Sequence, residues 1–340
     1  MRTTDFDYDL PRDRIAQTPV TPRHNSRLMV VNRSTGLIEH SQFWEIDRFL
    51  NPGDILVINE TRVIPARIFA RKQPGGGRVE LLLLEKGDAC TWTALVGGKG
   101  LTQGRRLSIE DGPAGEIVAM LDGSKRLVRF DEPIELFFDR VGNVPLPPYI
   151  HTRLDDPERY QTIYATAPGS AAAPTAGLHF TNLLMKKLAD QGVLFARVTL
   201  HVGLDTFAPV TEADPRTHKI HTEWCQLDRR AADEINAAKA AGKRVIAVGT
   251  TSVRTLESAA QRRADERVVS PISGPTDLFI LPRFTFKAVD VMITNFHLPK
   301  STLLMLVSAF ADRELILKAY EVAIDEDYRF FSFGDAMLIL

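Results

Sequence analysis

Histidines beside predicted strand and helix ends are the side chains of this sequence best suited to proton transfer. The chain has eight histidines, and an imidazole donates or accepts a proton near neutral pH. His179 lies directly before a predicted helix, and His201 ends an apolar predicted strand. Each of the two is therefore a candidate general acid or base. Each can equally be a hydrogen-bonded core residue, so position alone leaves both roles open.

The loop that precedes His179 is composed of residues that let a ligand approach the backbone closely. It contains Thr175 and Gly177, and a helix is predicted to begin at about Thr181. Small residues leave room beside the backbone, and the unpaired N–H groups of a helix start attract polar or anionic groups. We therefore expect Thr175, Gly177 and Thr181 to contact a substrate, unless the segment only packs at the helix start.

A second polar turn, at residues 249–252, joins a predicted buried strand to a predicted helix. Gly249, Thr250, Thr251 and Ser252 bring hydroxyl groups and helix N–H groups to one place, which suits a small polar or anionic ligand. The alternative is simple helix capping. The spacing is not that of a Walker phosphate loop, and no Gly-x-Gly-x-x-Gly follows a strand, which weakens a dinucleotide-binding interpretation.

Further polar residues occupy similar positions elsewhere in the chain. Asn295 and His297 form another turn between a strand and a helix, and Gly203 follows shortly after His201. His218 and His221 lie close to Glu223, so a metal site is one interpretation. The His-x-x-His spacing differs from that of a zincin helix, which leaves ligand contact or a structural role as alternatives.

Composition limits the class of protein. The chain has 340 residues with 42 Lys+Arg against 43 Asp+Glu, and 44% of its residues are hydrophobic. These values are typical of a globular protein with a sizeable core and argue against disorder and collagen. No apolar run has the roughly 20 residues of a membrane helix, and the acidic N-terminus does not resemble a signal peptide. With only two cysteines, Cys90 and Cys225, a cytoplasmic location is expected.

The charge is unevenly distributed along the chain. Between Glu60 and Ser108 nine Lys/Arg stand against four acidic residues. A basic segment on a nearly neutral protein can meet a phosphate backbone. It can also be an ordinary solvated surface, and the charge alone does not decide between the two.

The predicted elements that position these residues follow different patterns in two parts of the chain. From about residue 63 to 130, six short predicted strands are separated by Gly-rich or Asp-Gly turns, which indicates an antiparallel barrel or sandwich. The rest alternates helix and strand, which predicts an α/β layer with a largely parallel sheet. We expect an α/β domain over residues 1–61 and 132–340, with a β-rich, barrel-like domain inserted at 62–131.

Within the α/β part, several elements bear on the candidate site. Helices are predicted at Thr181–Asp190, Val253–Ala260 and Ser301–Phe310, and strands at Arg244–Val248 and Asp277–Leu281. The first helix has a leucine face and ends at a glycine. Ligand sites of α/β proteins lie at strand-to-helix turns, so the residues alone predict an enzyme without naming its reaction.

Taken together, these segments resemble the S-adenosylmethionine:tRNA ribosyltransferase-isomerase family of queuosine biosynthesis. The matching blocks run in order along nearly the whole chain, and the block that ends in Gly-Leu-His-Phe-Thr is the most specific. Departures are confined to Glu60 and to the loop at residues 204–208. The matching blocks are Tyr8–Pro11, Ile15–Gln17, Ser26–Leu28, Pro52–Arg67, Pro145–Ile150, Arg159–Thr162, Ala173–Thr181, Thr199–Gly203, His218–His221, Gly249–Ser252, Ile293–Pro299 and Tyr328–Ile339.

The resemblance implies a reaction. The ribosyl part of S-adenosylmethionine is transferred to 7-aminomethyl-7-deazaguanine at the tRNA wobble position and isomerised, which gives epoxyqueuosine in tRNA and releases adenine and methionine. It implies no metal and no redox cofactor, and no membrane partner. The oligomeric state is left open, with a monomer favoured.

The resemblance also gives the candidate residues roles. A base must remove a C5′ proton that the sulfonium acidifies, and an acid must help adenine to leave; His179 and His201 are the candidates for these two tasks. Thr250, Thr251 and Ser252 are expected to hold hydroxyl or carboxylate groups of the donor. Arg62 and Arg67, in or beside the basic segment, are expected to hold the anticodon arm. The other expected substrate contacts are Thr175, Gly177, Thr181, Gly203, His218, His221, Gly249, Asn295 and His297.

Three alternatives stay open at this point. A methyltransferase would use the same donor but release S-adenosylhomocysteine, and its usual Gly-rich loop after the first strand is absent. A tRNA-binding module would bind RNA without consuming the donor. A metal hydrolase would be built on His218, His221 and Glu223.

Overall fold

The chain folds into two compact units. The structure is a computed structural model that describes residues 1–203, 209–263 and 266–340. The α/β unit comprises Met1–Arg62, Pro148–Pro168 and Ala173–Leu340, and the barrel unit comprises Val63–Pro147 and Gly169–Ala172. The barrel unit extends beyond residue 131, where we expected its end, because β11 (Gly142–Asn143) still pairs with β5 (Arg67–Gln73). The loop at 204–208, one of the two departures from the family pattern, lies outside the described residues.

A mixed sheet forms the centre of the α/β unit. In the described part of the chain, its strand order is β16-β14-β13-β3-β15-β17-β18-β1-β2. The four neighbours β13, β3, β15 and β17 run parallel, as do β18 and β1, and the remaining pairs are antiparallel. The strands are β1 (Arg27–Val31), β2 (Ile38–Gln42), β3 (Ile55–Asn59), β13 (Leu194–Leu200), β14 (Glu223–Leu227), β15 (Val245–Val248), β16 (Ile272–Thr276), β17 (Val291–Asn295) and β18 (Ala336–Ile339).

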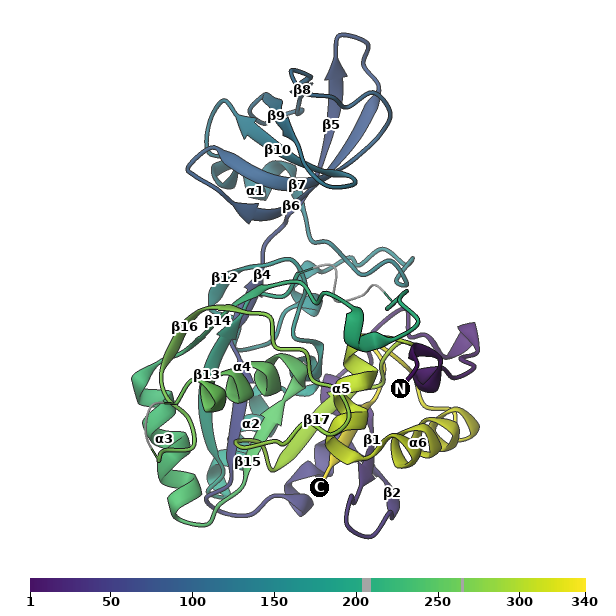
Figure 1. Cartoon of the computed structure of the whole chain (residues 1–340), viewed down its shortest axis with the longest axis vertical. Helices are drawn as coiled ribbons and strands as arrows, with labels where there is room; N and C mark the ends of the chain where they lie inside the picture. Colours follow the sequence, from purple (N-terminus) through teal and green to yellow (C-terminus); the bar gives the residue numbers. More distant parts are fainter. Residues whose placement is uncertain (204–208, 264–265) are drawn as a thin grey trace. The chain divides into compact units, whose positions relative to one another are not determined.

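Helices cover both faces of this sheet (Figure 1). The side chains of β3 show why, because they point alternately to the two faces of the sheet. Ile55 and Val57 pack into one hydrophobic cluster, and Leu56 and Ile58 pack into another. Strands that are buried on both faces read as continuous apolar runs. The first cluster includes residues of α3 (Arg229–Ala240), α4 (Gly249–Gln261), α5 (Thr302–Ala311) and α6 (Arg313–Asp325), and the second includes residues of α2 (Asn182–Asp190).

Most of these helices begin with a capping side chain. Thr181, Asp228, Ser301 and Asp312 accept hydrogen bonds from backbone N–H groups in the first turns of α2, α3, α5 and α6. Such caps satisfy N–H groups that have no partner within the helix. Helix α4 differs, because Val248 precedes it and supplies no capping side chain. The first N–H groups of α4 are therefore left for another partner.

The barrel unit contains the closed antiparallel barrel that the sequence predicted. Within the fully described stretch 63–147, the strand order β5-β6-β7-β10-β9-β8 closes through a pairing of β8 with β5. Its interior is apolar and includes Leu81, Leu107 and Val128. Closure removes the free edges that would invite aggregation. The strands are β5 (Arg67–Gln73), β6 (Arg78–Lys86), β7 (Thr91–Gly97), β8 (Arg106–Ser108), β9 (Gly115–Met120) and β10 (Lys125–Phe130), followed by the short helix α1 (Phe138–Val141). A separate two-stranded sheet pairs β4 (Thr61–Val63) with β12 (Ala167–Ser170).

Two expected elements are corrected. Asp277–Leu281 is not a strand; the strand lies just before it, at β16, and the segment is apolar because Ile280 packs against the helix-covered face. Helix α4 starts at Gly249 rather than Val253, so the polar turn is the first turn of the helix itself. None of the described helices is both long and apolar enough to span a lipid bilayer.

Candidate functional site

A cavity lies beyond the carboxyl ends of neighbouring parallel strands of the α/β unit. Gly249 directly follows β15, Asn295 ends β17, and Val202 comes two residues after β13; all three line the cavity. The space measures about 620 Å³, including a part that is open to solvent. Small-molecule sites of α/β proteins occur at this edge of the sheet. The cavity is therefore the candidate substrate site.

The start of α4 forms one wall of the cavity. Gly249 has a φ of +86°, a backbone conformation that glycine adopts without strain, and it turns the chain from β15 into the helix. Thr250 and Thr251 of the first turn also line the cavity, and the Thr251 hydroxyl is buried with no hydrogen-bond partner among the described residues. Uncapped N–H groups beside this hydroxyl suit a carboxylate or another anionic oxygen.

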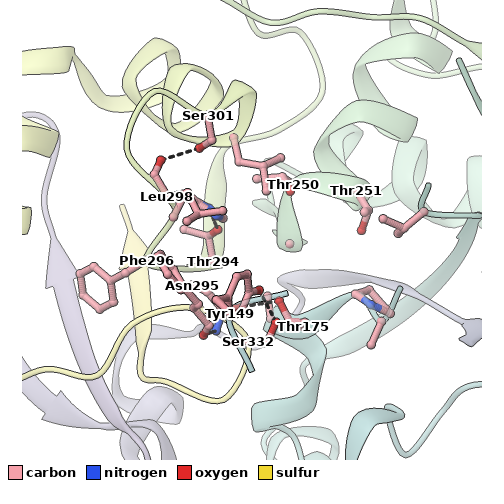
Figure 2. Close-up of a pocket in the computed structure, with 18 residues that line it drawn as sticks. Tyr149, Thr175, Thr250, Thr251, Thr294, Asn295, Phe296, Leu298, Ser301 and Ser332 are labelled. Carbon is pink, nitrogen blue, oxygen red and sulfur yellow. Dashed lines mark hydrogen bonds between the residues drawn. The ribbon is translucent and has the colours of Figure 1, made fainter. Parts of the chain in front are cut away.

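The opposite wall is organised by Asn295. Its amide nitrogen lies 3.3 and 3.5 Å from the carbonyls of Phe331 and Asp335, which share one of its two N–H groups, and its amide oxygen accepts from the Thr175 hydroxyl at 3.0 Å. Two carbonyl partners fix which end of the amide carries the nitrogen. Figure 2 shows Thr175 near Asn295, with Thr250 and Ser301 on the other side of the cavity.

His179 lies behind this wall and not in the cavity. It is completely buried, and its Nε2 is 3.0 Å from the Asn295 amide nitrogen. Because that nitrogen is a donor, Nε2 must accept, and the ring proton must sit on Nδ1, which is 2.7 Å from the Ser26 hydroxyl. Burial, with the charges of Arg23 and Arg329, holds the pKa of His179 well below its usual range. His179 is thus a neutral residue that supports Asn295.

His297 is the imidazole that lines the cavity. Its Nε2 is 2.7 Å from the Thr294 hydroxyl, and its backbone N–H donates to the Tyr320 hydroxyl at 2.9 Å. Burial lowers the pKa of His297 to about 3, because a buried cation loses its hydration. His297 is therefore neutral at neutral pH and acts here as a hydrogen-bonding group.

The rest of the lining combines hydroxyl groups with aromatic rings. Tyr149 and Ser332 form a hydrogen bond of 2.8 Å, and the rings of Tyr149 and Phe331 lie 4.7 Å apart. Among the described residues that line the cavity, no side chain is a carboxylate, a lysine or an arginine. Hydroxyl and amide groups match the hydroxyls of a ribose, and aromatic rings match the flat face of a base or a cation.

His201 lies at the end of β13, outside the lining of this cavity. Its Nδ1 is 2.8 Å from the Thr61 hydroxyl, and its ring stacks on Trp224 with centroids 5.4 Å apart. Burial lowers the pKa of His201, which favours the neutral form that can accept a proton. His201 itself does not line the cavity, but the next residue, Val202, does.

The histidine pair after β13 forms two separate contacts. His218 Nδ1 is 2.9 Å from Glu212, and His221 Nε2 is 3.3 Å from Glu223. Glu223 is buried, pairs with Arg254 and accepts the Gly203 N–H at 3.0 Å. Burial by itself would raise the pKa of Glu223, but the Arg254 charge and the His221 hydrogen bond bring it below its usual value.

The separate contacts of His218 and His221 are relevant to the interpretation of this segment as a metal site. Within the described residues, no group of three or more histidine, cysteine, aspartate or glutamate side chains is placed to hold a metal ion. His221 lies beside a smaller cavity that Arg254 also lines, and His218 contacts Phe279. Neither histidine, nor Gly203, lines the main cavity.

Three further residues that were expected to contact substrate instead make contacts within the protein. A Cβ at Gly177 would collide with the Tyr164 hydroxyl, so this glycine makes room for a neighbouring tyrosine. Thr181 caps α2 and contacts His24 at 2.6 Å, and the Ser252 hydroxyl donates to the carbonyl of Val248, directly before α4. Of the residues expected to contact substrate, the structure brings together Thr175, Gly249, Thr250, Thr251, Asn295 and His297.

The two arginines expected to hold tRNA are both ion-paired. Arg62, in the α/β unit, pairs with Glu158, and Arg67, in the barrel unit, pairs with Glu80 at 3.0 Å. An incoming phosphate would have to compete with these carboxylates. Their contribution to RNA binding stays a prediction.

Sequence reasoning did not single out several residues that line the cavity. Tyr149 follows the proline-rich stretch at 145–148, Ser332 lies in the aromatic C-terminal segment, and Ser301 caps α5. The available signal was their position within blocks that match the family or beside a helix start. No local pattern shows that residues so far apart in the chain share one cavity.

A family model, related proteins and a solved structure each match nearly the whole chain. A family model described as queuosine biosynthesis protein matches residues 3–339. The chain is 54% identical over 344 residues to the S-adenosylmethionine:tRNA ribosyltransferase-isomerase of Symbiobacterium thermophilum, and 52% identical over 343 residues to that of Clostridioides difficile, with full coverage of both chains each time. It is also similar to the crystal structure of S-adenosylmethionine tRNA ribosyltransferase from Thermotoga maritima, at 40% identity and a TM-score of 0.58 over 99% of this chain and 100% of that chain.

The buried neutral histidines predict how stability depends on pH. His297 takes up a proton at about pH 6.5 when unfolded but only near pH 3 when folded. The unfolded state therefore binds more protons in that window, and we expect stability to fall as pH falls below about 6.5, by up to about 1.4 kcal/mol per pH unit for each such histidine.

In the His297→Gln variant, the free energy of unfolding should fall less steeply with falling pH than in the wild type. Urea unfolding at several pH values measures this slope. The exposed His151 provides the control, because His151→Gln should leave the slope unchanged. Equal slopes in His297→Gln and the wild type would contradict the assignment of His297 as a buried neutral group.

Proposed function

The chain belongs to the queuosine biosynthesis protein family, and from this we propose that it is an S-adenosylmethionine:tRNA ribosyltransferase-isomerase. It transfers the ribosyl part of S-adenosylmethionine to tRNA and isomerises it, with release of adenine and methionine. We further propose that the acceptor is 7-aminomethyl-7-deazaguanine at the wobble position. Action in the cytoplasm, as a monomer and without a metal or redox cofactor, is part of the same proposal.

The observation that carries the proposal is the composition of the cavity. Its hydroxyl and amide groups suit a ribose, and the Tyr149–Phe331 ring pair suits adenine or the sulfonium. The uncapped start of α4, with the Thr251 hydroxyl, suits the carboxylate of the methionyl part. These three features match the three parts of S-adenosylmethionine, so we propose that the donor binds there.

Two proton transfers remain to be assigned to side chains. We propose His201 as the base for the C5′ proton, because burial favours its neutral form, the Thr61 hydroxyl orients its ring, and the next residue, Val202, lines the cavity. His179 stays a candidate for the second transfer, although its position behind Asn295 favours an indirect contribution through that side chain. Both assignments require substrate to be bound.

The barrel unit offers a surface for the RNA backbone. Arg71 lies directly opposite Arg78 in the β5–β6 pairing, and like charges in that position destabilise a sheet. Both are exposed, as is Lys99, and none of the three has a carboxylate partner in the described part of the chain. Arg106, by contrast, pairs with Asp131 at 2.8 Å. Unpaired cations on one barrel favour contact with phosphates.

Adenine release tests the reaction. The protein is mixed with S-adenosylmethionine and a tRNA that carries 7-aminomethyl-7-deazaguanine, and products are separated by chromatography. We expect adenine and methionine with the modified tRNA and neither with unmodified tRNA. S-adenosylhomocysteine without adenine would indicate a methyltransferase, and RNA binding without either product would indicate a binding module. Activity should persist with a chelator present.

Substitution of the two histidines tests their roles. His201→Gln should lower the rate of adenine release by about two to four orders of magnitude, the usual contribution of general acid–base catalysis. His179→Gln should mainly weaken donor binding, because it disturbs Asn295. Unfolding transitions measured in parallel show whether each variant is folded. Near-normal turnover by folded His201→Gln would remove this residue from the mechanism.

The salt dependence of tRNA binding tests the barrel surface. Each lost phosphate contact should reduce the slope of log Kd against log salt by about one. We expect Arg71→Gln and Arg78→Gln to do so, and Arg106→Gln, a cation with a carboxylate partner, to change the slope less. Arg62→Gln and Arg67→Gln measure whether those paired arginines also contribute. A slope that the barrel variants leave unchanged would locate the RNA elsewhere.

A further inference from the structure

Three arginines of the α/β unit lie around the N-terminal loop at residues 18–22. Arg23 begins the short 3-10 helix Arg23–Asn25 that follows this loop, Arg159 belongs to the short helix Pro157–Tyr160, and Arg329 belongs to the C-terminal segment. Arg159 donates to the carbonyls of Pro19 and Val20, at 3.1 and 3.3 Å, and Arg329 lies 3.5 Å from the carbonyl of Thr18. Segments far apart in the sequence thus bring three guanidinium groups to one loop.

The cluster has more positive than negative charge. Asp335, which is buried, pairs with Arg329 at 3.3 Å. In the described part of the chain, neither Arg23 nor Arg159 has a carboxylate at ion-pair distance. Burial, together with the charges of Arg329 and Arg159, lowers the pKa of Arg23 to about 9. Three positive charges therefore face one negative charge, in an arrangement that an added anion would stabilise.

Arg23 also lacks good hydrogen-bond partners. Its Nε is buried with none among the described residues, and its Nη1 reaches the carbonyls of Phe333 and Gly334 only at 3.4 and 3.5 Å. Its Nη2 lies 3.4 Å from Nδ1 of His179, the nitrogen to which the Asn295 contact assigns the ring proton. A donor facing a donor makes no hydrogen bond, so Arg23 has unused donors in a place where leaving them unpaired is costly.

We propose that Arg23, Arg159 and Arg329 form a binding site for a phosphodiester group of the RNA substrate. Guanidinium groups bind phosphate oxygens through paired, charge-assisted hydrogen bonds. The inference rests on the proposed function, since it takes the RNA as the source of the phosphate. Arg329 lies two residues before Phe331, which lines the cavity.

The carboxylate of S-adenosylmethionine is the competing anion, and the geometry argues against it. None of the three arginines lines the cavity, whereas the uncapped start of α4 does. A phosphodiester next to the reacting nucleotide would instead be held at the cavity's margin while the base enters. The site would fix the register of the RNA and leave the donor inside the cavity untouched.

The test measures binding of an anticodon stem–loop RNA that carries 7-aminomethyl-7-deazaguanine, by fluorescence anisotropy at several salt concentrations. Arg159→Gln should weaken binding by about tenfold or more and reduce the salt slope by about 0.7, the value for one phosphate contact on single-stranded RNA. Arg159→Lys keeps the charge and should retain most of the slope. Arg14→Gln is the control, because Arg14 pairs with Asp327.

Other outcomes would overturn the proposal. If Arg159→Gln keeps the wild-type slope, or changes the KM for S-adenosylmethionine and not RNA binding, the site does not hold an RNA phosphate. Arg329→Gln serves as a second variant with the same expectation, in case loss of Arg159 loosens the loop and the unfolding midpoint falls. RNA binding does not depend on turnover, so a wild-type protein that binds the stem–loop but releases no adenine would contradict the proposed function alone.

Discussion

The Asn295 side chain is the interaction on which the arrangement of the site depends. It ends β17 in the middle of the sheet and bonds to the Thr175 hydroxyl, to His179, and to the carbonyls of Phe331 and Asp335. A single buried amide thereby holds the small-residue loop and the C-terminal segment in fixed positions. Buried polar groups of this kind must be fully paired, because each unpaired one is costly. The same requirement sets the protonation of His179 and, through it, leaves Arg23 short of acceptors.

The fold could be predicted from the sequence where each element carries its own signal. The barrel strands alternate and are separated by glycine turns, and the helices at α2 and α3 have apolar faces and glycine stops. The elements that were missed depend on distant partners. Strand β18 is buried between β17 and β1, whose residues are far away in the chain, and its short apolar run has no period that separates a strand from a buried helix. The segment around Ile280 is apolar because Ile280 packs in the hydrophobic core, and not because it pairs as a strand.

The site could be predicted only in part, again because the local sequence does not show which distant residues become neighbours. Strand-to-helix turns can be found in a sequence, and Thr250, Thr251 and Asn295 were found in this way. Which small residue makes room for a ligand and which for a neighbour cannot be found locally: Gly177 faces Tyr164, which lies thirteen positions earlier in the chain. Likewise, a histidine before a helix looks the same whether it faces a cavity or lies under it. The burial of His179 is set by Phe43 and Ser26, from another part of the chain.

The absence of charged side chains from the described lining has a chemical consequence for a sulfonium substrate. A carboxylate beside the sulfur would stabilise the cation in the ground state and reduce its power to acidify the C5′ protons. Hydroxyl groups and aromatic faces hold the cation more weakly and leave that power intact. His297 is consistent with this proposal, because its pKa of about 3 keeps it neutral beside the proposed sulfonium ligand. For a donor bound in this cavity as proposed, the neutral lining of the described residues favours proton removal. Arg23, Arg159 and Arg329 lie outside that lining, so an RNA phosphate bound there as proposed would not neutralise the sulfonium.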